Sequence, residues 1–285
     1  MSGFNYDKAF SRNIGWLTLS EQQQLKSKKI AIAGLGGVGG SHLLTLIRLG
    51  ITQFTIADFD HFEVHNFNRQ AGANMHSLDQ EKCATLARMA IEINPEAEVK
   101  TFPNGIDETN VDDFLDGVDV YVDSLDFFAL KAREMVFKKC HDKGIPALTA
   151  APLGMGVSFL AFLPGRMSFE TYFDWKGKTD QEKLVRFIAG LSPAMLQRDY
   201  LAAPESVNFA ENRGPSVVMA CELCAGLMGT QVLKLLIQRG DVVAAPWGLQ
   251  FDAYRQKMRK TWRPFGNKNP LQKILMLLIK KKLGL

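Results

Sequence analysis

Residues 29–40 read Lys-Ile-Ala-Ile-Ala-Gly-Leu-Gly-Gly-Val-Gly-Gly, and this stretch decides the fold. Its first five residues form a short apolar run between charge and glycine, which is typical of a buried parallel strand. The glycines then fit the pattern G-x-G-x-x-G, and helical spacing of apolar residues follows from Val38 to Leu49. Glycine suits such a turn because the backbone bends tightly and approaches a phosphate with no Cβ in the way. The N–H groups at the helix start would face that anion, so the stretch predicts nucleotide binding.

A second apolar run, residues 53–57, ends at Asp58, about 20 residues beyond the glycines, where an acid of a nucleotide-binding fold meets a ribose hydroxyl. Strand and helix patterns alternate from residue 29 to 150. This alternation predicts a doubly wound, Rossmann-like α/β fold with a mainly parallel sheet and helices on both faces. The pattern leaves the identity of the nucleotide open.

Composition excludes several classes of protein. The 285 residues are 46% hydrophobic and carry a formal net charge of +4, with no basic stripe that indicates nucleic-acid binding. No apolar run reaches the length of about 18 residues that a membrane span needs. The polar N-terminus and four cysteines predict a cytoplasmic protein with reduced thiols.

The chain divides into five predicted segments. Aromatic residues and a helix pattern interrupt the strand–helix rhythm after residue 163, which we interpret as a lid or insertion over the ligand edge of the sheet. The C-terminal run is apolar with lysines, so it predicts a packed terminal helix, with a partner-binding or membrane-surface helix as alternatives. The segments are an arm at 1–27, a nucleotide-binding core at 28–163, a lid at 164–215, the rest of the core at 216–260 and a basic amphipathic tail at 261–285.

Polar residues crowd the ends of two predicted strands. The segment 58–70 reads Asp-Phe-Asp-His-Phe-Glu-Val-His-Asn-Phe-Asn-Arg-Gln, and a later strand ends in Asp123-Ser-Leu-Asp126. In open α/β sheets ligands bind at the carboxyl ends of the strands. Paired acids there indicate a metal or a hydroxyl-rich ligand, although Asp126 could instead cap the next helix. Lys82 and Arg12, taken alone, read as solvated surface cations.

These motifs, in this order, resemble the ThiF/MoeB/HesA family, the adenylating core shared with ubiquitin-activating enzymes. The resemblance covers roughly residues 10–163, with 216–236 similar to a later helix of the family. It implies ATP and Mg²⁺ as cofactors. The residues it assigns to catalysis are Arg69, Lys82, Asp126 and Arg12, with Asp126 as the magnesium ligand. Those it assigns to nucleotide binding are Gly34, Gly36, Gly37, Gly39, Asp58, Asp60, Asn66, Asn68, Gln70 and Asp123.

The implied reaction is the attack of a substrate carboxylate on the α-phosphorus of ATP, with release of pyrophosphate. Cations placed in advance around the phosphates would reduce the repulsion between the two anions. The implied acceptor is the C-terminal glycine of a ubiquitin-like or sulfur-carrier protein, with a small-molecule carboxylate or a tRNA threonylcarbamoyl group as alternatives. The family is usually homodimeric, with an N-terminal arginine reaching the partner's site, and Arg12 stands at that position.

Two departures from the family pattern concern cysteine. Only one Cys-x-x-Cys pair, Cys221 and Cys224, is present, whereas a closed zinc site usually needs four ligands, so zinc is not expected. Residues 144–220 contain no cysteine for a thioester. A nicotinamide-dependent oxidoreductase remains an alternative that rests on the glycine turn and Asp58 alone, and a catalytically idle binding partner remains a third.

Overall fold

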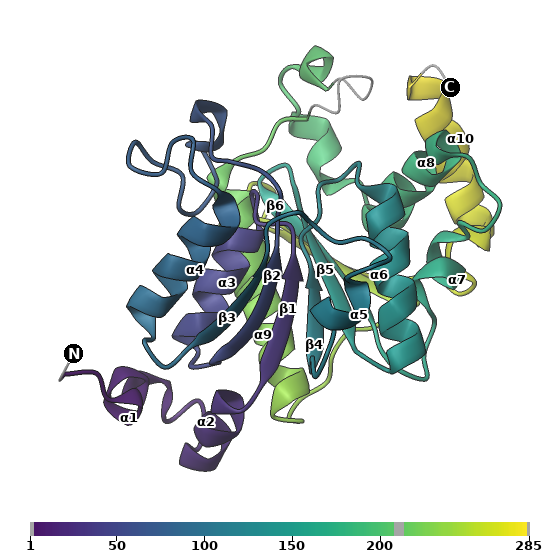
Figure 1. Ribbon diagram of the computed structural model, residues 1–285. Coiled ribbons are helices and arrows are strands. Elements are labelled where there is room, and N and C mark those ends of the chain that lie inside the picture. Colours follow the sequence, from purple (N-terminus) through teal and green to yellow (C-terminus); the bar gives the residue numbers. More distant parts are fainter. Residues whose placement is uncertain (1–2, 208–213, 284–285) are drawn as a thin grey trace.

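The computed structural model describes residues 3–207 and 214–283. In that part of the chain, eight strands form one sheet in the order β3-β2-β1-β4-β5-β6-β7-β8 (Figure 1). The first five strands are parallel, and the last three continue the sheet in antiparallel fashion, so the sheet is mixed. The strands are β1 (Lys29–Ala33), β2 (Gln53–Ala57), β3 (Glu98–Phe102), β4 (Val120–Asp123), β5 (Ala147–Leu153), β6 (Gly156–Phe162), β7 (Trp247–Asp252) and β8 (Lys257–Trp262).

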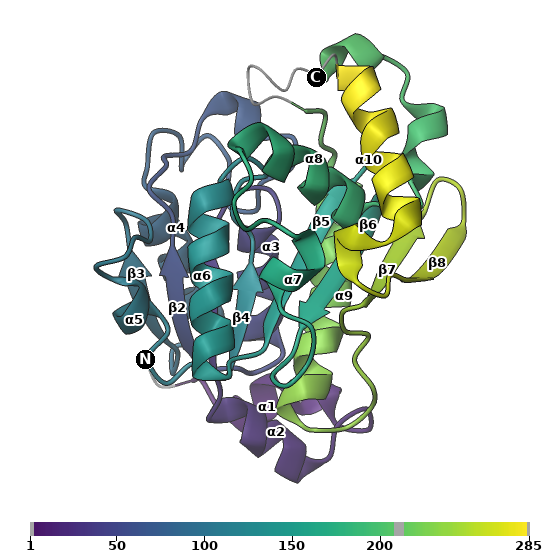
Figure 2. The ribbon, with the colours of Figure 1, turned by 90° about the vertical axis from the view of Figure 1, so that its right-hand side faces the viewer.

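Helices cover both faces of the sheet, which confirms the predicted α/β class (Figure 2). Successive side chains of β1 point to opposite faces of the sheet. Ile30 and Ile32 pack in the core under α3, α4 and α9, and Ala31 and Ala33 pack in the core under α5 to α8. The helices are α1 (Tyr6–Ala9), α2 (Leu19–Lys26), α3 (Gly39–Arg48), α4 (Lys82–Ile93), α5 (Val111–Phe114), α6 (Leu130–Lys143), α7 (Phe169–Phe173), α8 (Asp180–Leu191), α9 (Val218–Leu236) and α10 (Pro270–Leu283).

Helix α4 begins later than its sequence pattern indicates. The apolar spacing predicts a helix from Leu78, but α4 starts at Lys82. Asp79 has a φ of +62°, and its N–H donates to the carbonyl of Phe62 at 2.9 Å. The segment before α4 therefore pairs with the loop after β2 instead of continuing the helix. This pairing makes Lys82 the first residue of α4, at the carboxyl end of the sheet.

The aromatic residues that we assigned to a lid are core residues. Phe169, Tyr172, Phe173 and Trp175 are each 3% exposed or less, and they pack with α6, α8 and the strands between them. Residues 169–191 thus form part of the layer over β5 and β6. Residues 208–213 of the predicted lid lie outside the described residues, and the division into segments stays a prediction.

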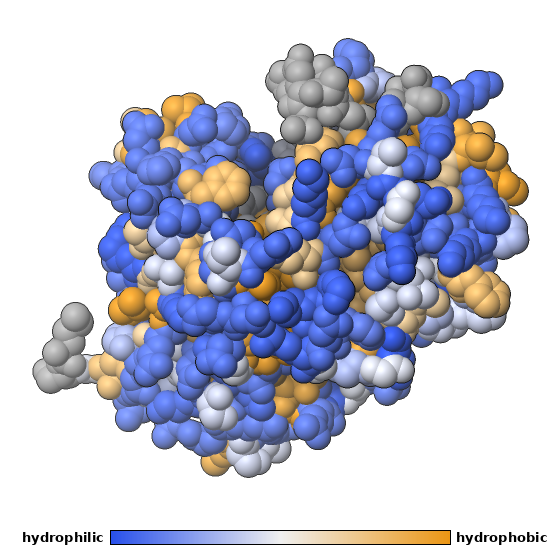
Figure 3. Space-filling model, turned by 45° about the vertical axis from the view of Figure 1, so that its right-hand side comes forward, coloured by the Kyte–Doolittle hydropathy of each residue, from blue (hydrophilic) through white to orange (hydrophobic). Residues whose placement is uncertain are grey.

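The two C-terminal helices of the described chain differ in their surroundings. Helix α9 is the one helix there that is long and apolar enough to span a membrane by length and composition, but it packs as a core helix against α3, β5 and β6. Helix α10 packs Met276 and Ile279 against α8 and leaves an apolar outer face exposed, seen as an orange patch at the right of Figure 3. That face consists of Leu271, Ile274, Leu277 and Leu278.

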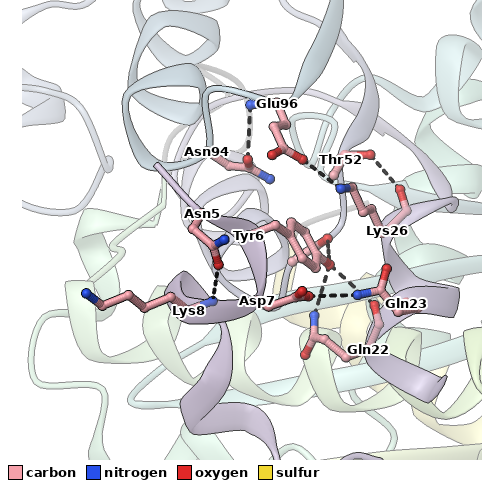
Figure 4. A network of polar contacts seen from close by, with 11 residues as sticks. Asn5, Tyr6, Asp7, Lys8, Gln22, Gln23, Lys26, Thr52, Asn94 and Glu96 are labelled. Carbon is pink, nitrogen blue, oxygen red and sulfur yellow. Dashed lines mark hydrogen bonds and ion pairs between the residues drawn. The ribbon is translucent and has the colours of Figure 1, made fainter. Parts of the chain in front are cut away.

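The N-terminal arm is tied to the end of the sheet opposite the glycine turn. The hydroxyl of Tyr6 donates to the carbonyl of Gly50 at 2.6 Å and accepts from Nε2 of Gln22 at 3.0 Å (Figure 4). Lys26 forms an ion pair with Glu96 at 2.7 Å. Because Gly50 lies just past the C-terminus of α3, the length of that helix separates the arm from the glycine turn (Figure 1).

Candidate active site

The glycine turn after β1 contains glycines of two kinds. Gly34 has a φ of +85°, and a Cβ there would lie 2.2 Å from the carbonyl oxygen of Ser124. A Cβ on Gly39 would lie 1.9 Å from the carbonyl oxygen of Gly34. At Gly36, by contrast, the nearest atom to such a Cβ is Nε2 of Gln70 at 3.7 Å. The fold itself therefore requires Gly34 and Gly39, whereas the space above Gly36 is left open.

Two predicted site residues, Arg69 and Gln70, lie next to this turn. Nε of Arg69 lies 3.7 Å from the Cβ position of Gly37, beside the contact of Gln70 with Gly36. Gln70 is 8% exposed, and its Oε1 is buried without a hydrogen-bond partner in the structure. A buried polar atom without a partner is costly in a finished structure. The arrangement leaves the backbone at Gly36 free for a polar ligand, beside the side chains of Arg69 and Gln70.

Asp58 lies at the end of β2, directly beside the turn. Its Oδ2 accepts from the N–H of Leu35 at 2.6 Å, and its Oδ1 accepts from the N–H of Asp60 at 2.8 Å. Burial raises the pKa of Asp58, and the positive charge of Lys82 opposes part of that rise. The strand end thus places this carboxylate where the sequence predicts a ribose contact.

Lys82 and Asp60 form an ion pair at the same edge. Nζ of Lys82 lies 2.9 Å from Oδ2 of Asp60, and the lysine side chain is only 5% exposed while that of Asp60 is 54% exposed. The N–H of Lys82 also donates to the carbonyl of Asp60 at 3.0 Å. The structure therefore brings the predicted lysine to the loop after β2. Lys82 is buried there, whereas the local sequence pattern suggests a solvated side chain.

The segment 64–70 folds into a compact turn that points Arg69 and Gln70 inward. Asn66 is 3% exposed, and its Oδ1 accepts from the N–H of Glu63 at 3.0 Å. The amide of Asn68 donates to the carbonyl of Ser216 at 3.0 Å, and its oxygen accepts from Nη1 of Arg69 at 2.8 Å. The two asparagines thus make contacts within the protein that shape the segment, and their predicted contact with a nucleotide stays a prediction.

Asp123 and Asp126, at the end of β4, have different surroundings. Asp126 is exposed, and its Oδ1 accepts from the N–H of Phe128 at 2.9 Å, so it forms a turn and does not cap α6. Asp123 is 1% exposed, and its Oδ2 accepts from Nε of Arg133 at 2.9 Å. The geometry offers no support for the predicted contact of Asp123 with a nucleotide, since its carboxylate is enclosed by protein. The sequence analysis did not identify Arg133, because nothing in the sequence pattern of α6 distinguishes it from any other arginine on a helix.

Arg12 is not part of the site within its own chain. It lies on an exposed 3₁₀ turn (Ser11–Asn13) of the N-terminal arm. The side-chain amide of the neighbouring Asn13 donates to the carbonyl of Leu49 at 3.2 Å, at the far end of α3 from the glycines. Any contact of Arg12 with a nucleotide would therefore need the site of a second subunit.

The cysteine pair lies in the core. Cys221 and Cys224 are both fully buried on α9, and burial raises the pKa of each thiol. Sγ of Cys221 lies 3.3 Å from the Cβ position of Gly37, so α9 supports the glycine turn from below. Among the described residues, no three His, Cys, Asp or Glu side chains converge in a way that would hold a metal ion. A metal at this edge would take most of its ligands from a bound substrate.

The geometry at the edge suits a polyanion. Arg69 stands beside the glycine turn that leads into the N-terminus of α3, and Lys82 lies past the end of β2, paired with Asp60 and close enough to Asp58 to affect its pKa. Backbone N–H groups at a helix start and cationic side chains are the groups that bind phosphates. An exposed carboxylate, Asp126, lies at the end of the neighbouring strand β4.

Comparisons with known proteins agree with this fold. The chain is 30% identical over 142 residues to a tRNA threonylcarbamoyladenosine dehydratase of Bacillus subtilis, covering 50% of this chain and 55% of that protein. It is 30% identical over 122 residues to a probable molybdopterin-synthase adenylyltransferase of Gracilaria tenuistipitata var. liui, covering 43% and 34%. The chain thus spans about half or less of the length of these relatives.

The fold matches solved structures of E. coli MccB. A complex with MccA superimposes with a TM-score of 0.70 at 17% identity, covering 95% of this chain and 75% of that one. A complex with ATP superimposes with a TM-score of 0.65 at 18% identity, covering 89% and 69%. The model of the ThiF family matches residues 10–273, which is nearly the whole chain. This protein belongs to the ThiF family.

Proposed function

We propose that the protein is an ATP-dependent adenylyltransferase that activates a carboxylate as an acyl-adenylate and releases pyrophosphate. The observation that carries the proposal is the glycine turn, where a Cβ on Gly36 would meet nothing closer than Nε2 of Gln70 at 3.7 Å and where Arg69 stands beside Gly37. Membership of the ThiF family and the match to an MccB complex with ATP support the choice of ATP. A nicotinamide cofactor would leave the role of Arg69 and Lys82 unexplained.

In the proposed reaction the protein acts through charge and position. Arg69 and Lys82 would neutralise the triphosphate, which lowers the repulsion that an approaching carboxylate meets. In this proposal the ammonium of Lys82 leaves Asp60 for phosphate oxygens. Asp58 would accept from the ribose. No nucleophilic side chain is needed, because the substrate carboxylate itself attacks the α-phosphorus.

Magnesium fits the residues present, as part of this proposal. Mg²⁺ is usually held by one or two carboxylates and by substrate phosphates, and Asp126 offers one exposed carboxylate at the right edge. Asp123 does not fit that role because it is buried against Arg133. The ion would supply charge neutralisation on the polyphosphate.

The acceptor that we propose first is the C-terminal glycine of a ubiquitin-like or sulfur-carrier protein. Support comes from relatives named as molybdopterin-synthase adenylyltransferase and as adenylyltransferase and sulfurtransferase UBA4. A second candidate is activation of a threonylcarbamoyl group on tRNA, which the Bacillus subtilis relative favours. The mild net charge of +4 supplies little attraction for tRNA.

The test is exchange of labelled pyrophosphate into ATP against a panel of carboxylates, including small proteins that end in Gly-Gly and threonylcarbamoylated tRNA. We expect Arg69→Ala and Asp126→Ala to abolish substrate-dependent exchange without loss of fold. The matched control is Arg88→Ala, since Arg88 is an exposed arginine on α4 that pairs with Glu92. Unimpaired exchange in Arg69→Ala would reject the role of Arg69, and tight NAD(H) binding without ATP affinity would reject the reaction.

We also propose a homodimer in which Arg12 completes the partner's site. The proposal rests on the position of Arg12 at the opposite end of its own sheet. Mixing the Arg12→Ala and Arg69→Ala proteins, each inactive alone, should restore part of the exchange activity, because one mixed site would contain both arginines. Activity of the mixture equal to that of its parents would contradict shared sites.

A further inference from the structure

The loop between β4 and α6 holds Asp126 in an exposed position that its own short-range bonds do not fully fix. Its carboxylate accepts from the N–H of Phe128, and its carbonyl accepts from the N–H of Ala129 at 3.0 Å. Both bonds are local and face solvent. A carboxylate that must meet a ligand in one geometry needs support from a more rigid part of the protein.

Arg133 supplies contacts on both sides of Asp126. Its Nη2 donates to the carbonyl of Leu125 at 2.6 Å, and its Nη1 donates to the carbonyl of Phe127 at 3.4 Å. These are the residues immediately before and after Asp126. The guanidinium therefore bonds the backbone of the loop at the residue before Asp126 and at the residue after it.

The guanidinium is itself held in place by an ion pair and by an aromatic ring. Nε donates to Oδ2 of Asp123 at 2.9 Å, with side-chain exposures of 3% for Arg133 and 0% for Asp123. The carbon Cζ lies 4.6 Å from the centre of the Phe187 ring, which belongs to α8. Arg133 thus links the end of β4, the first turn of α6 and α8 to one short loop.

We propose that Arg133 is the positioning residue of Asp126. The proposal rests on the proposed function, because it concerns how Asp126 meets Mg²⁺ and nucleotide. A planar fork with several donors can bond a carboxylate and two carbonyls at once, whereas a lysine ammonium on a flexible stem cannot reproduce that arrangement. Groups that orient a metal ligand typically change metal affinity or activity by about 10- to 100-fold when they are removed.

A purely structural ion pair in the same layer provides the comparison. Glu134, the next residue of α6, accepts from Nζ of Lys183 on α8, with exposures of 32% and 13%. That pair joins the same two helices through partners other than the residues of the loop at 124–129. If Arg133 only holds α6 in place, substitution of either residue should affect the protein in the same way.

The experiment compares Arg133→Lys with Glu134→Gln, using Mn²⁺ as the probe in the presence of a non-hydrolysable ATP analogue. Mn²⁺ binding is followed by electron paramagnetic resonance, and we expect Arg133→Lys to weaken it by about 10-fold. The same variant should lower kcat of exchange by about 10- to 100-fold, with little change in the KM for ATP. Glu134→Gln should shift only the thermal midpoint. Wild-type Mn²⁺ affinity in a folded Arg133→Lys protein overturns the proposal.

Further variants keep the outcomes distinct. If Arg133→Lys does not fold, Phe187→Leu decides, because it removes the ring beneath the guanidinium and keeps the hydrogen bonds. The Phe187 ring also lies 5.2 Å from the ring of Phe127 in the loop, so Phe127→Leu is measured beside it. A loss of Mn²⁺ affinity about threefold or more above that of Phe127→Leu supports the proposal, and an equal or smaller loss overturns it. Asp126→Asn tests the function on which the inference rests. Undiminished Mn²⁺ binding in Asp126→Asn rejects the metal role of Asp126, whereas loss in Asp126→Asn without loss in Arg133→Lys rejects only the role of Arg133.

Discussion

The glycine turn after β1 and the loop after β4 are neighbours at the same edge of the sheet, but they are built by opposite means. The turn depends on missing side chains: Gly34 and Gly39 approach so closely that a Cβ on either would overlap backbone atoms. The loop depends on a side chain brought from α6, since Arg133 bonds the carbonyls on both sides of Asp126. One is specified by local sequence and the other by a tertiary contact.

The two segments also support one another. The carbonyl of Ser124, at the start of the loop, fills the space where a side chain on Gly34 would lie. The hydroxyl of Ser124 is hydrogen bonded to Nδ1 of His42 on α3 at 2.9 Å. The structure therefore teaches that the proposed phosphate site and the proposed metal ligand are parts of one packed unit, so a change in either should be felt by the other.

The largest expected effect concerns the glycine turn, which depends on missing side chains. Gly34→Ala should destabilise the protein by roughly 4 kcal/mol, because alanine disfavours a φ of +85° and its Cβ would meet Ser124 at 2.2 Å. Gly36→Ala should cost about 1 kcal/mol or less, since its nearest neighbour lies at 3.7 Å, and it should instead weaken ATP binding. Denaturant unfolding and ATP titration measure the two effects. Equal stability losses would contradict the division into two kinds of glycine.

The next effect concerns the loop after β4, which depends on its tertiary contact with Arg133. Asp123→Asn should destabilise the fold by about 3 kcal/mol, because it leaves the buried charge of Arg133 without its partner. Asp126→Asn should leave the stability within about 0.5 kcal/mol, because its carboxylate is exposed, and should abolish pyrophosphate exchange. Urea unfolding of both proteins is the measurement. A stable Asp123→Asn protein would mean that the loop is held without this ion pair.

The third effect appears only below neutral pH, and it concerns the contact between the two segments. Burial lowers the pKa of His42 to about 3, well below its ordinary value near 6.5. Between these pH values the unfolded chain binds a proton that the folded protein does not. Stability present above pH 6.5 should therefore be lost as the pH falls towards 3, by at most about 1.4 kcal/mol per pH unit.

The measurement is the difference between wild type and His42→Gln in urea unfolding at several pH values. The difference removes contributions of other groups, such as Asp58, whose pKa is raised by burial and which acts in the opposite direction. Parallel pH profiles for the two proteins would show that His42 is not the neutral, buried link that the structure describes.

The sequence predicted much of the parallel half of the sheet. β1 and β2 have the predicted bounds because short apolar runs bounded by glycine or charge have few alternatives. The antiparallel half was harder to predict. Strand β8 was missed, because Lys257, Arg259 and Lys260 make it hydrophilic and it is stabilised by pairing with β7. Helix α4 was predicted to start too early, because the bridge between His61 and Glu81 competes with helix formation.

What the sequence by itself determined is the turn: its glycines, the strand before it and the polar residues that follow β2 and β4 lie in an order that predicts a nucleotide-binding edge. What only the tertiary structure decided is which of those polar residues are buried in ion pairs and which are exposed. Asp123 and Asp126 look equivalent in the chain, but Arg133 buries one and leaves the other exposed. The physical reason is that backbone conformation is restricted locally by each residue's own sterics, whereas burial and pairing depend on which distant side chain arrives.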